Sequence, residues 1–178
     1  MLTPGASAPP AARPGTRLAV RVRQASVRDL DDVLALRLAL LREHPDHPIY
    51  GRLRRDVDAR ARELFASQLR STMEAIFLAD LASEVVGVLR CVESIGSPLL
   101  EPARYAYVSS VYVRPEHRRR GVLRALLQAA EQWSASRALG QMRLHNVHGS
   151  VQAEAAWEAL GFRIVEQVRV RELAPDKG

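Results

Sequence analysis

The spacing of apolar residues in the first part of the chain predicts one strand followed by one helix. Apolar and polar residues alternate over residues 18–23, which is typical of a half-buried strand. Ser26 and Asp29 then form an S-x-x-D sequence, which predicts the N-terminal cap of a helix. The apolar residues with helical spacing are Leu30, Val33, Leu34, Leu38 and Leu41. This helix should end near Pro45.

A second helix and a hairpin are expected next. Residues 56–73 have a helical pattern with Leu64, Phe65 and Leu69 on one side. Short β-forming runs at 75–79 and 85–92 flank a turn at 81–84, and this arrangement predicts a hairpin. Residues 105–113 are dense in β-branched and aromatic residues and predict a fourth strand.

The remaining pattern alternates between helices and strands. A helix is expected over 122–137, with an apolar side of Val122, Leu126, Ala129, Ala130 and Trp133. A fifth strand is expected over 142–147. The next helix carries apolar residues from Ala153 to Leu160 and stops at Gly161, a residue type that favours helix C-termini. Residues 162–173 predict a final strand.

Length and composition predict one domain with a tail. The first 17 of the 178 residues are rich in Pro and Ala, and we expect a disordered tail there and a single domain over residues 18–174. The single Cys91 excludes an internal disulfide and a cysteine-cluster metal site. No apolar run reaches the roughly 18 residues that span a membrane, so we expect a cytoplasmic protein with no membrane partner.

Positive charge is concentrated in one short segment. The formal charge is +6, and Lys177 is the only lysine. Between Val111 and Arg124 there are five arginines against one glutamate. Nucleic acid binding would need charge and aromatic residues spread along a groove. A compact cluster is explained better by a phosphate-bearing cofactor, so no nucleic acid partner is expected.

That segment reads as strand, basic turn and helix start. The strand ends at Pro115, the residues Arg118, Arg119, Arg120 and Gly121 follow, and an apolar helical pattern begins at once. A helix N-terminus offers unpaired N–H groups and a partial positive charge, which makes it an anion site. Arginine adds forked, charge-assisted hydrogen bonds that suit phosphate. The segment therefore predicts a pyrophosphate site.

These residues resemble the GNAT superfamily of acyl-CoA-dependent N-acyltransferases. The family's cofactor loop reads Q/R-x-x-G-x-G/A after a strand ending V-x-P, and residues 118–123 follow Val113-Arg114-Pro115 in this way. A later helix ends at Leu160-Gly161-Phe162, also as in the family. The resemblance implies an α/β (α+β, mixed-sheet) fold: a mostly antiparallel sheet of six to seven strands, strands four and five splayed, and about four helices.

The resemblance also implies where acetyl-CoA binds. Backbone groups of the fourth strand would bind the pantetheine amides as an added strand does, and the loop amides would face the pyrophosphate. The implied cofactor-binding residues are Val111, Tyr112, Val113, Arg118, Arg119, Arg120, Gly121, Val122, Leu123 and Arg124. Leu123 departs from the family's Gly/Ala, and it either crowds the pyrophosphate or points into the core.

The family tyrosine that protonates the leaving thiolate is replaced here by Trp157. Indole cannot act as an acid, and losing a general acid costs about 10²–10⁴ in rate. Packing is the favoured role for Trp157. Ser150, Tyr105, Tyr107 or water are the candidates that would replace the missing acid.

The general base is also missing from its family position, because Ser109 and Ser110 stand where relatives carry a glutamate. Glu93, Glu101 and His145 remain as candidates, and histidine has the most suitable titration range. We take Glu93, His145 and Tyr107 as the candidate catalytic residues. His44 and His47 lie in a loop without further ligands, so no metal is expected.

The implied activity is acetyl transfer from acetyl-CoA to a primary amine of a small molecule or peptide, by direct attack in a ternary complex. The alternative is a catalytically silent acyl-CoA-binding sensor or partner-binding module, suggested by the two replaced residues. Residues 44–62 are basic, which mildly disfavours a polycationic acceptor. Many relatives are dimers, and a homodimer stays open for this chain.

Overall fold

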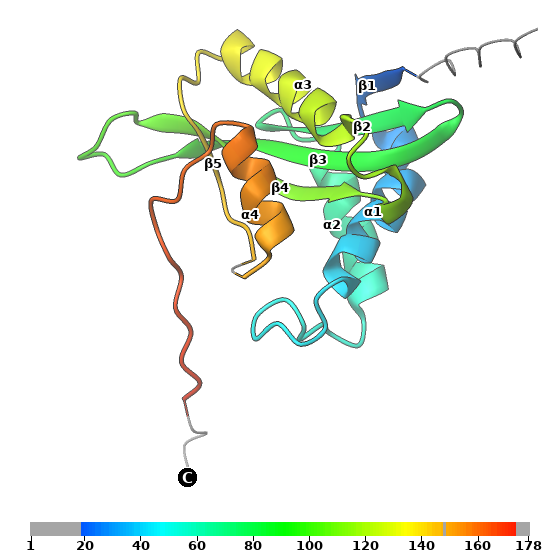
Figure 1. Ribbon diagram of the computed structural model, residues 1–178, viewed down its shortest axis with the longest axis horizontal. Coiled ribbons are helices and arrows are strands. Elements are labelled where there is room, and N and C mark those ends of the chain that lie inside the picture. The colour runs from blue at the N-terminus through cyan, green and yellow to red at the C-terminus, as the bar shows by residue number, and fades with distance from the viewer. Residues whose placement is uncertain (1–18, 148, 174–178) are drawn as a thin grey trace, which may run out of the picture.

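The computed structural model describes residues 19–147 and 149–173 (Figure 1). The five strands in this part of the chain are β1 (Val20–Gln24), β2 (Glu74–Leu81), β3 (Glu84–Ile95), β4 (Arg104–Val113) and β5 (Met142–Leu144). The four α-helices within the same residues are α1 (Leu30–Arg42), α2 (Val57–Gln68), α3 (Val122–Ser136) and α4 (Val151–Ala159). The expected tail, residues 1–17, lies outside the described residues.

The expected fold class is confirmed, and so is the mostly antiparallel sheet. The strands lie in the order β1-β2-β3-β4-β5. The first three pairings are antiparallel, and only β4 with β5 is parallel. The expectation of six to seven strands was wrong, since the sheet has five strands within the residues that the structure describes.

Strands β4 and β5 diverge after a short contact. Their register runs from Ala106 opposite Met142 to Val108 opposite Leu144. Strand β4 then continues to Val113 with no partner on that side among residues 19–147 and 149–173. This is the splay that the family resemblance implied. It also explains why β5 ends at Leu144 instead of residue 147, since the diverging strands offer no further ladder partner.

A bulge in β4 lies just past the divergence. Arg90 pairs with Ser109 and Val88 pairs with Tyr112, so two residues of β4 lie opposite the single residue Leu89 of β3. Ser110 takes a φ of +50°, in the left-handed region that favours glycine. Bulges of this kind re-aim backbone and side chains and are common next to active sites.

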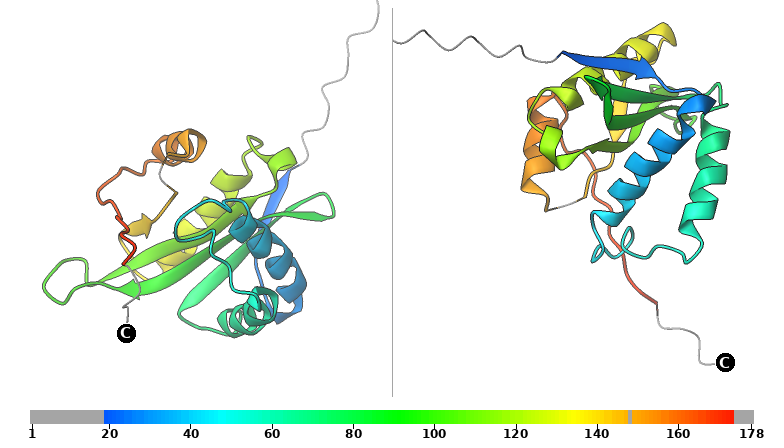
Figure 2. Two further views of the ribbon diagram at one scale, coloured as in Figure 1. Left: turned by 90° about the horizontal axis from the view of Figure 1, so that it is seen from below. Right: turned by 90° about the vertical axis from the view of Figure 1, so that its right-hand side faces the viewer.

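One helix packs on one face of the sheet and two helices pack on the other face (Figure 2). Helix α3 lies on one face, where Val122, Leu126 and Ala130 pack against sheet residues that include Ala106 and Val108. Helices α1 and α2 cover the other face, through residues such as Val33 and Phe65. Helix α4 lies apart on the β5 side (Figure 1) and has no buried residue. The two core layers fix β4 between them.

The predicted cap of the first helix is confirmed. The backbone N–H of Ser26 donates to Asp29 Oδ2 at 2.8 Å, and the N–H of Arg28 donates to Ser26 Oγ at 3.3 Å. This capping box forms over the 3-10 turn Val27–Asp29 that leads into α1. No helix among residues 19–147 and 149–173 is both long and apolar enough to cross a lipid bilayer.

Two predictions from local pattern were wrong. Residues 162–173 form no strand, and side chains such as Val165 and Val170 are exposed. A β-forming sequence becomes a strand only where an edge is available, and β5 offers only three residues. Helix α2 ends at Gln68 and leaves Leu64 53% exposed, because Phe65 and Ala61 already fill the contact with the sheet.

Candidate functional site

The turn between β4 and α3 has the predicted order of strand, basic turn and helix. The N–H of Arg114 donates to Val86 O at 2.9 Å and ends the β3–β4 pairing. Pro115–His117 forms a 3-10 turn, and Gly121, with a φ of +85°, is the N-cap of α3. Arg119 also takes a positive φ, +59°. The backbone therefore takes the left-handed conformation at two positions before the helix begins.

This geometry leaves a set of backbone donors unpaired. The first bond of α3 is that from the N–H of Ala125 to Gly121 O, at 3.0 Å. Within the described part of the chain, the N–H groups of residues 119–124 have no acceptor. Together with the helix dipole they form a concentrated anion site.

Gly121 keeps the space in front of these donors open. A Cβ at this position would meet no atom within 4 Å. An added side chain would not clash with protein, but it would occupy the open space at the N-terminus of α3. The positive φ adds a cost for any other L-residue.

The four arginines of residues 118–124 divide into two groups. Arg119, Arg120 and Arg124 are exposed and have no ion-pair partner among the residues described. Arg118 is held by the protein itself, because its Nε donates to Val113 O at 2.9 Å and its terminal nitrogen pairs with Glu43. Three guanidinium groups are therefore free to meet an anion, and the fourth braces the turn.

The apolar residues of the segment anchor it to the core. Val122 is 2% exposed, and Leu123 packs against the core beneath α3. Of the two roles that the sequence left open for Leu123, the structure shows packing. Tyr112 packs instead on the core shared with α1 and α2. The helix start is fixed in place by these contacts.

The exposed edge of β4 completes the predicted cofactor-binding region. In the described part of the chain, the β5 side of β4 has no strand partner beyond Val108, and this stretch contains Val111, Tyr112 and Val113. Every second backbone group of a strand points to such an edge, so the edge can bind an extended chain of amides.

Two of the three predicted catalytic residues meet where β4 and β5 diverge. Tyr107 Oη lies 3.0 Å from His145 Nδ1, with the two rings edge to face. Burial raises the pKa of Tyr107, the Tyr50 and Tyr105 phenols raise it further, and Arg90 opposes them. The phenol of Tyr107 is therefore kept protonated near neutral pH.

Glu93, the third predicted catalytic residue, lies elsewhere. It shares the α3 face of β3 with Cys91, whereas Tyr107 is on the opposite face. Its side chain is 5% exposed, pairs with Arg104 and lies 3.0 Å from Arg137. The structure does not bring Glu93 together with Tyr107 and His145.

Trp157 packs locally, at the end of α4. Its ring lies edge to face with Phe162 at 5.3 Å between centroids, and the Phe162 N–H donates to Trp157 O at 3.0 Å. The contact closes the turn at Gly161, whose φ is +89°. Aromatic pairing thus accounts for the indole at the position of the family tyrosine.

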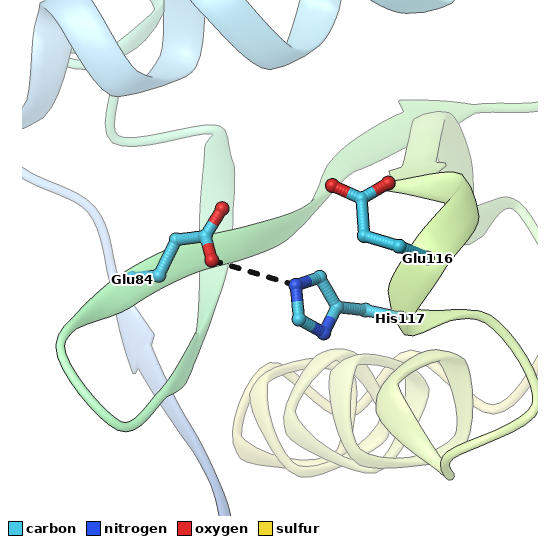
Figure 3. Close-up of side chains that lie close together, drawn as sticks. All are labelled: Glu84, Glu116 and His117. Carbon is cyan, nitrogen blue, oxygen red and sulfur yellow. Dashed lines mark ion pairs between the residues drawn. The ribbon is translucent and has the colours of Figure 1, made fainter.

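One cluster of possible metal ligands was missed by the sequence reasoning. Glu84, Glu116 and His117 place one ligand atom each within 4.8 Å of one another (Figure 3). Glu84 is already paired, with His117 Nε2 at 3.4 Å and with Arg114 at 3.4 Å. These contacts tie the β2–β3 hairpin to the turn before α3. Only the tertiary structure brings Glu84 to the adjacent pair Glu116-His117.

The loop histidines are arranged differently. His47 Nδ1 accepts the N–H groups of Ile49 and Tyr50, at 3.2 and 3.1 Å, and its ring stacks on Tyr50. This nitrogen shapes the loop between α1 and α2, and its lone pair is not free for a metal.

One family model and several solved structures match this chain. Residues 37–162 match the Acetyltransferase (GNAT) family. No curated protein matches the chain significantly. A predicted acetyltransferase with acetyl-CoA from Clostridium acetobutylicum has a similar structure, with a TM-score of 0.70 and 15% identity over 86% of this chain and 96% of that one.

Two further solved structures agree with it. An aminoglycoside 6′-N-acetyltransferase from Acinetobacter haemolyticus has a TM-score of 0.69 at 22% identity, over 88% of this chain and 99% of that one. A probable acetyltransferase has a TM-score of 0.66 at 26% identity, over 89% and 99% of the two chains. Because the family match spans more than half of the sequence, this chain belongs to the Acetyltransferase (GNAT) family.

Proposed function

We propose that residues 18–174 form a single acetyl-CoA-dependent N-acetyltransferase domain. It would transfer the acetyl group to a primary amine of a small molecule or peptide by direct attack within a ternary complex. The observation that carries this proposal is the row of unpaired N–H groups at residues 119–124, with three unpaired arginines around it. Such a site suits a diphosphate more closely than any other common ligand.

The residues present fit acetyl-CoA along its length. The N–H groups of residues 119–124 and the guanidinium groups of Arg119, Arg120 and Arg124 would hold the pyrophosphate. Arg118 would contribute only its backbone, since its side chain binds Glu43. The edge of β4 at Val111 and Val113 would bind the pantetheine amides, and it leads back to the divergence of β4 and β5.

The reacting groups would meet near the bulge of β4. A backbone N–H near Val111 would stabilise the negative charge that develops on the thioester oxygen. The acceptor would approach over the face that carries Tyr107 and Ser109, beside the loop between α1 and α2. Holding both reactants in this geometry supplies most of the rate gain.

The acceptor is proposed to be a neutral or acidic amine. Arg52, Arg54, Arg55 and Arg60 outnumber the aspartates in residues 44–62, and this surplus repels polycations. One structural neighbour is named as an aminoglycoside acetyltransferase, so proteins of this fold can also take polycationic acceptors. A panel of tyramine, lysine, aspartate, kanamycin and spermidine with acetyl-CoA would test the class.

Calorimetric titration of acetyl-CoA tests the cofactor site. Wild-type protein should bind, and Gly121→Val should bind about tenfold or more weakly, because its side chain enters the phosphate space. Gly161→Val is the matched control, since Gly161 has a similar φ of +89° and equally open surroundings. The absence of binding by wild type at millimolar acetyl-CoA would refute the proposal.

The silent acyl-CoA-binding module is supported by Trp157, which occupies the place of the family acid. Thiol release from acetyl-CoA in the presence of the amine panel separates the two functions. Turnover with any of these amines establishes the enzyme. Tight acetyl-CoA binding without turnover on every amine favours the module.

A further inference from the structure

Tyr107 and His145 occupy one face of the sheet at the divergence of β4 and β5. Ala106 and Val108 belong to the core beneath α3, so Tyr107 between them points to the opposite face. Met142 and Leu144 also pack on the α3 side, which places His145 on the same face as Tyr107. His145 is the first residue after β5, so it meets Tyr107 just past the last paired residues of β4 and β5.

The surroundings of the pair are polar and partly open. His145 is exposed, whereas Tyr107 is half-buried. Ser109, the next residue of β4 on this face, accepts a hydrogen bond from Arg90 at 3.1 Å, so its hydroxyl is already engaged. The other titratable and charged groups near the pair are Tyr105 from β4, Arg143 from β5 and Tyr50 from the loop after α1. Arg90 of β3 also faces Tyr107, and it is paired with Glu74 of β2.

We propose that His145 is the general base of the acetyl transfer and that Tyr107 is its positioning residue; this rests on the function proposed above. In the proposed arrangement His145 Nδ1–H donates to Tyr107 Oη, and the Nε2 lone pair is left to accept a proton. The hydrogen bond selects the tautomer, as the partner of one ring nitrogen commonly does for the other. Neither residue has another hydrogen bond within the described chain that would compete.

The proton balance closes with these groups. Nε2 takes one proton from the acceptor ammonium and frees the nitrogen lone pair. The new C–N bond forms as the C–S bond breaks, and the amide nitrogen passes its second proton to the CoA sulfur, giving a thiol. His145 then releases its proton to water, which its exposure permits.

Competing side chains are less suited to this role. The Glu93 carboxylate is bound by Arg104 and Arg137 on the other face of the sheet. Glu101 lies in the exposed loop before β4, where its Oε2 accepts the N–H of Ala103 at 3.3 Å. His145 is the candidate that combines an orienting partner, access to solvent and a position at the divergence of the strands.

Three variants of the full chain test this proposal with the best amine of the panel above. His145→Gln should lower kcat by about 10²–10⁴ with acetyl-CoA affinity unchanged. Tyr107→Phe should lower kcat about fivefold, the value of one hydrogen bond, and move the acidic limb of the kcat/KM profile to lower pH. Glu131→Gln, on the exposed side of α3, should leave both unchanged.

A second readout does not depend on turnover. Nitrogen-15 NMR of labelled histidine should show His145 protonated at Nδ1 in wild type and a mixture of tautomers in Tyr107→Phe. An Nε2-protonated ring in wild type, or full turnover by His145→Gln, overturns the proposal. Wild-type protein that transfers acetyl to none of the amines overturns the proposed function instead, which is a separate result.

Discussion

Arg118 joins the turn after β4 to Glu43, the residue that follows the last turn of α1. The same guanidinium donates from Nε to Val113 O at 2.9 Å. The proposed phosphate-binding turn is therefore fastened to the helix that borders the acceptor side. Neighbouring arginines therefore differ in role: Arg118 is ion-paired within the protein, whereas Arg119 and Arg120 have no ion-pair partner among the described residues.

Neutralising single arginines should distinguish those that bind acetyl-CoA from Arg118, which stabilises the turn. Arg120→Gln should weaken acetyl-CoA binding about tenfold, because an unpaired guanidinium that meets phosphate is lost. Its melting temperature should stay at the wild-type value. Arg118→Gln should instead reduce the free energy of unfolding by up to about 1 kcal/mol, as for a partly exposed ion pair. Calorimetry and denaturant unfolding of both variants test this, and equal binding losses would contradict it.

Glu93→Gln should affect stability more than catalysis. The carboxylate is 5% exposed and pairs with Arg104 and Arg137, so its neutralisation leaves two cations without their partner. We expect a loss of about 1–3 kcal/mol in the free energy of unfolding, with kcat within a few fold of wild type. Urea unfolding and steady-state kinetics measure the two effects. Unchanged stability with a hundredfold loss of kcat would make Glu93 the base.

Arg37 should make stability rise at alkaline pH. It is 7% exposed, its Nε has no partner in the described structure, and its Nη1 donates to Gln68 at 2.5 Å. Burial, with a smaller effect of Arg90, lowers its pKa to about 9. Below pH 9 the folded protein carries a costly buried charge. Above pH 9 the folded protein loses this proton while the unfolded chain still holds it. The free energy of unfolding therefore rises with pH in this range.

Comparison with Arg37→Met isolates this effect. The variant should be more stable than wild type at pH 7, because a buried charge is replaced by an apolar chain of similar length. Its advantage should shrink above pH 9, by at most about 1.4 kcal/mol per pH unit. Thermal unfolding between pH 7 and 10.5 measures the difference. A constant difference across that range would show that Arg37 does not titrate there.

Trp157 should act through packing. Trp157→Phe keeps an aromatic ring against Phe162 and should retain kcat within a few fold. Trp157→Ala should lose about 0.5–1.5 kcal/mol of stability for the aromatic pair. Denaturant unfolding and acetyl transfer assays of both variants check this. A large loss of kcat in Trp157→Phe, at normal stability, would assign the indole N–H a role in the reaction.

Local sequence determined most of the elements and the anion site. A β-branched run, a proline stop, three arginines and a glycine are enough to specify strand, turn and helix start, because each step depends on backbone preferences of neighbouring residues. The helix cap at Ser26 and the helix end at Gly161 were predictable for the same reason. The unpaired amides of residues 119–124 follow directly from where α3 begins.

Only the tertiary structure decided which of these residues act together. The pairing of β4 with β5 put Tyr107 beside His145 at the end of β5, and alternation along β3 sent Glu93 to the other face of the sheet. Residues 162–173 form no strand. The tertiary fold also brought Arg118 and Glu43 together as an ion pair. Alternation along a strand fixes which residues share a face, but the partner strand and its offset are set by packing between distant segments. No local pattern contains that information.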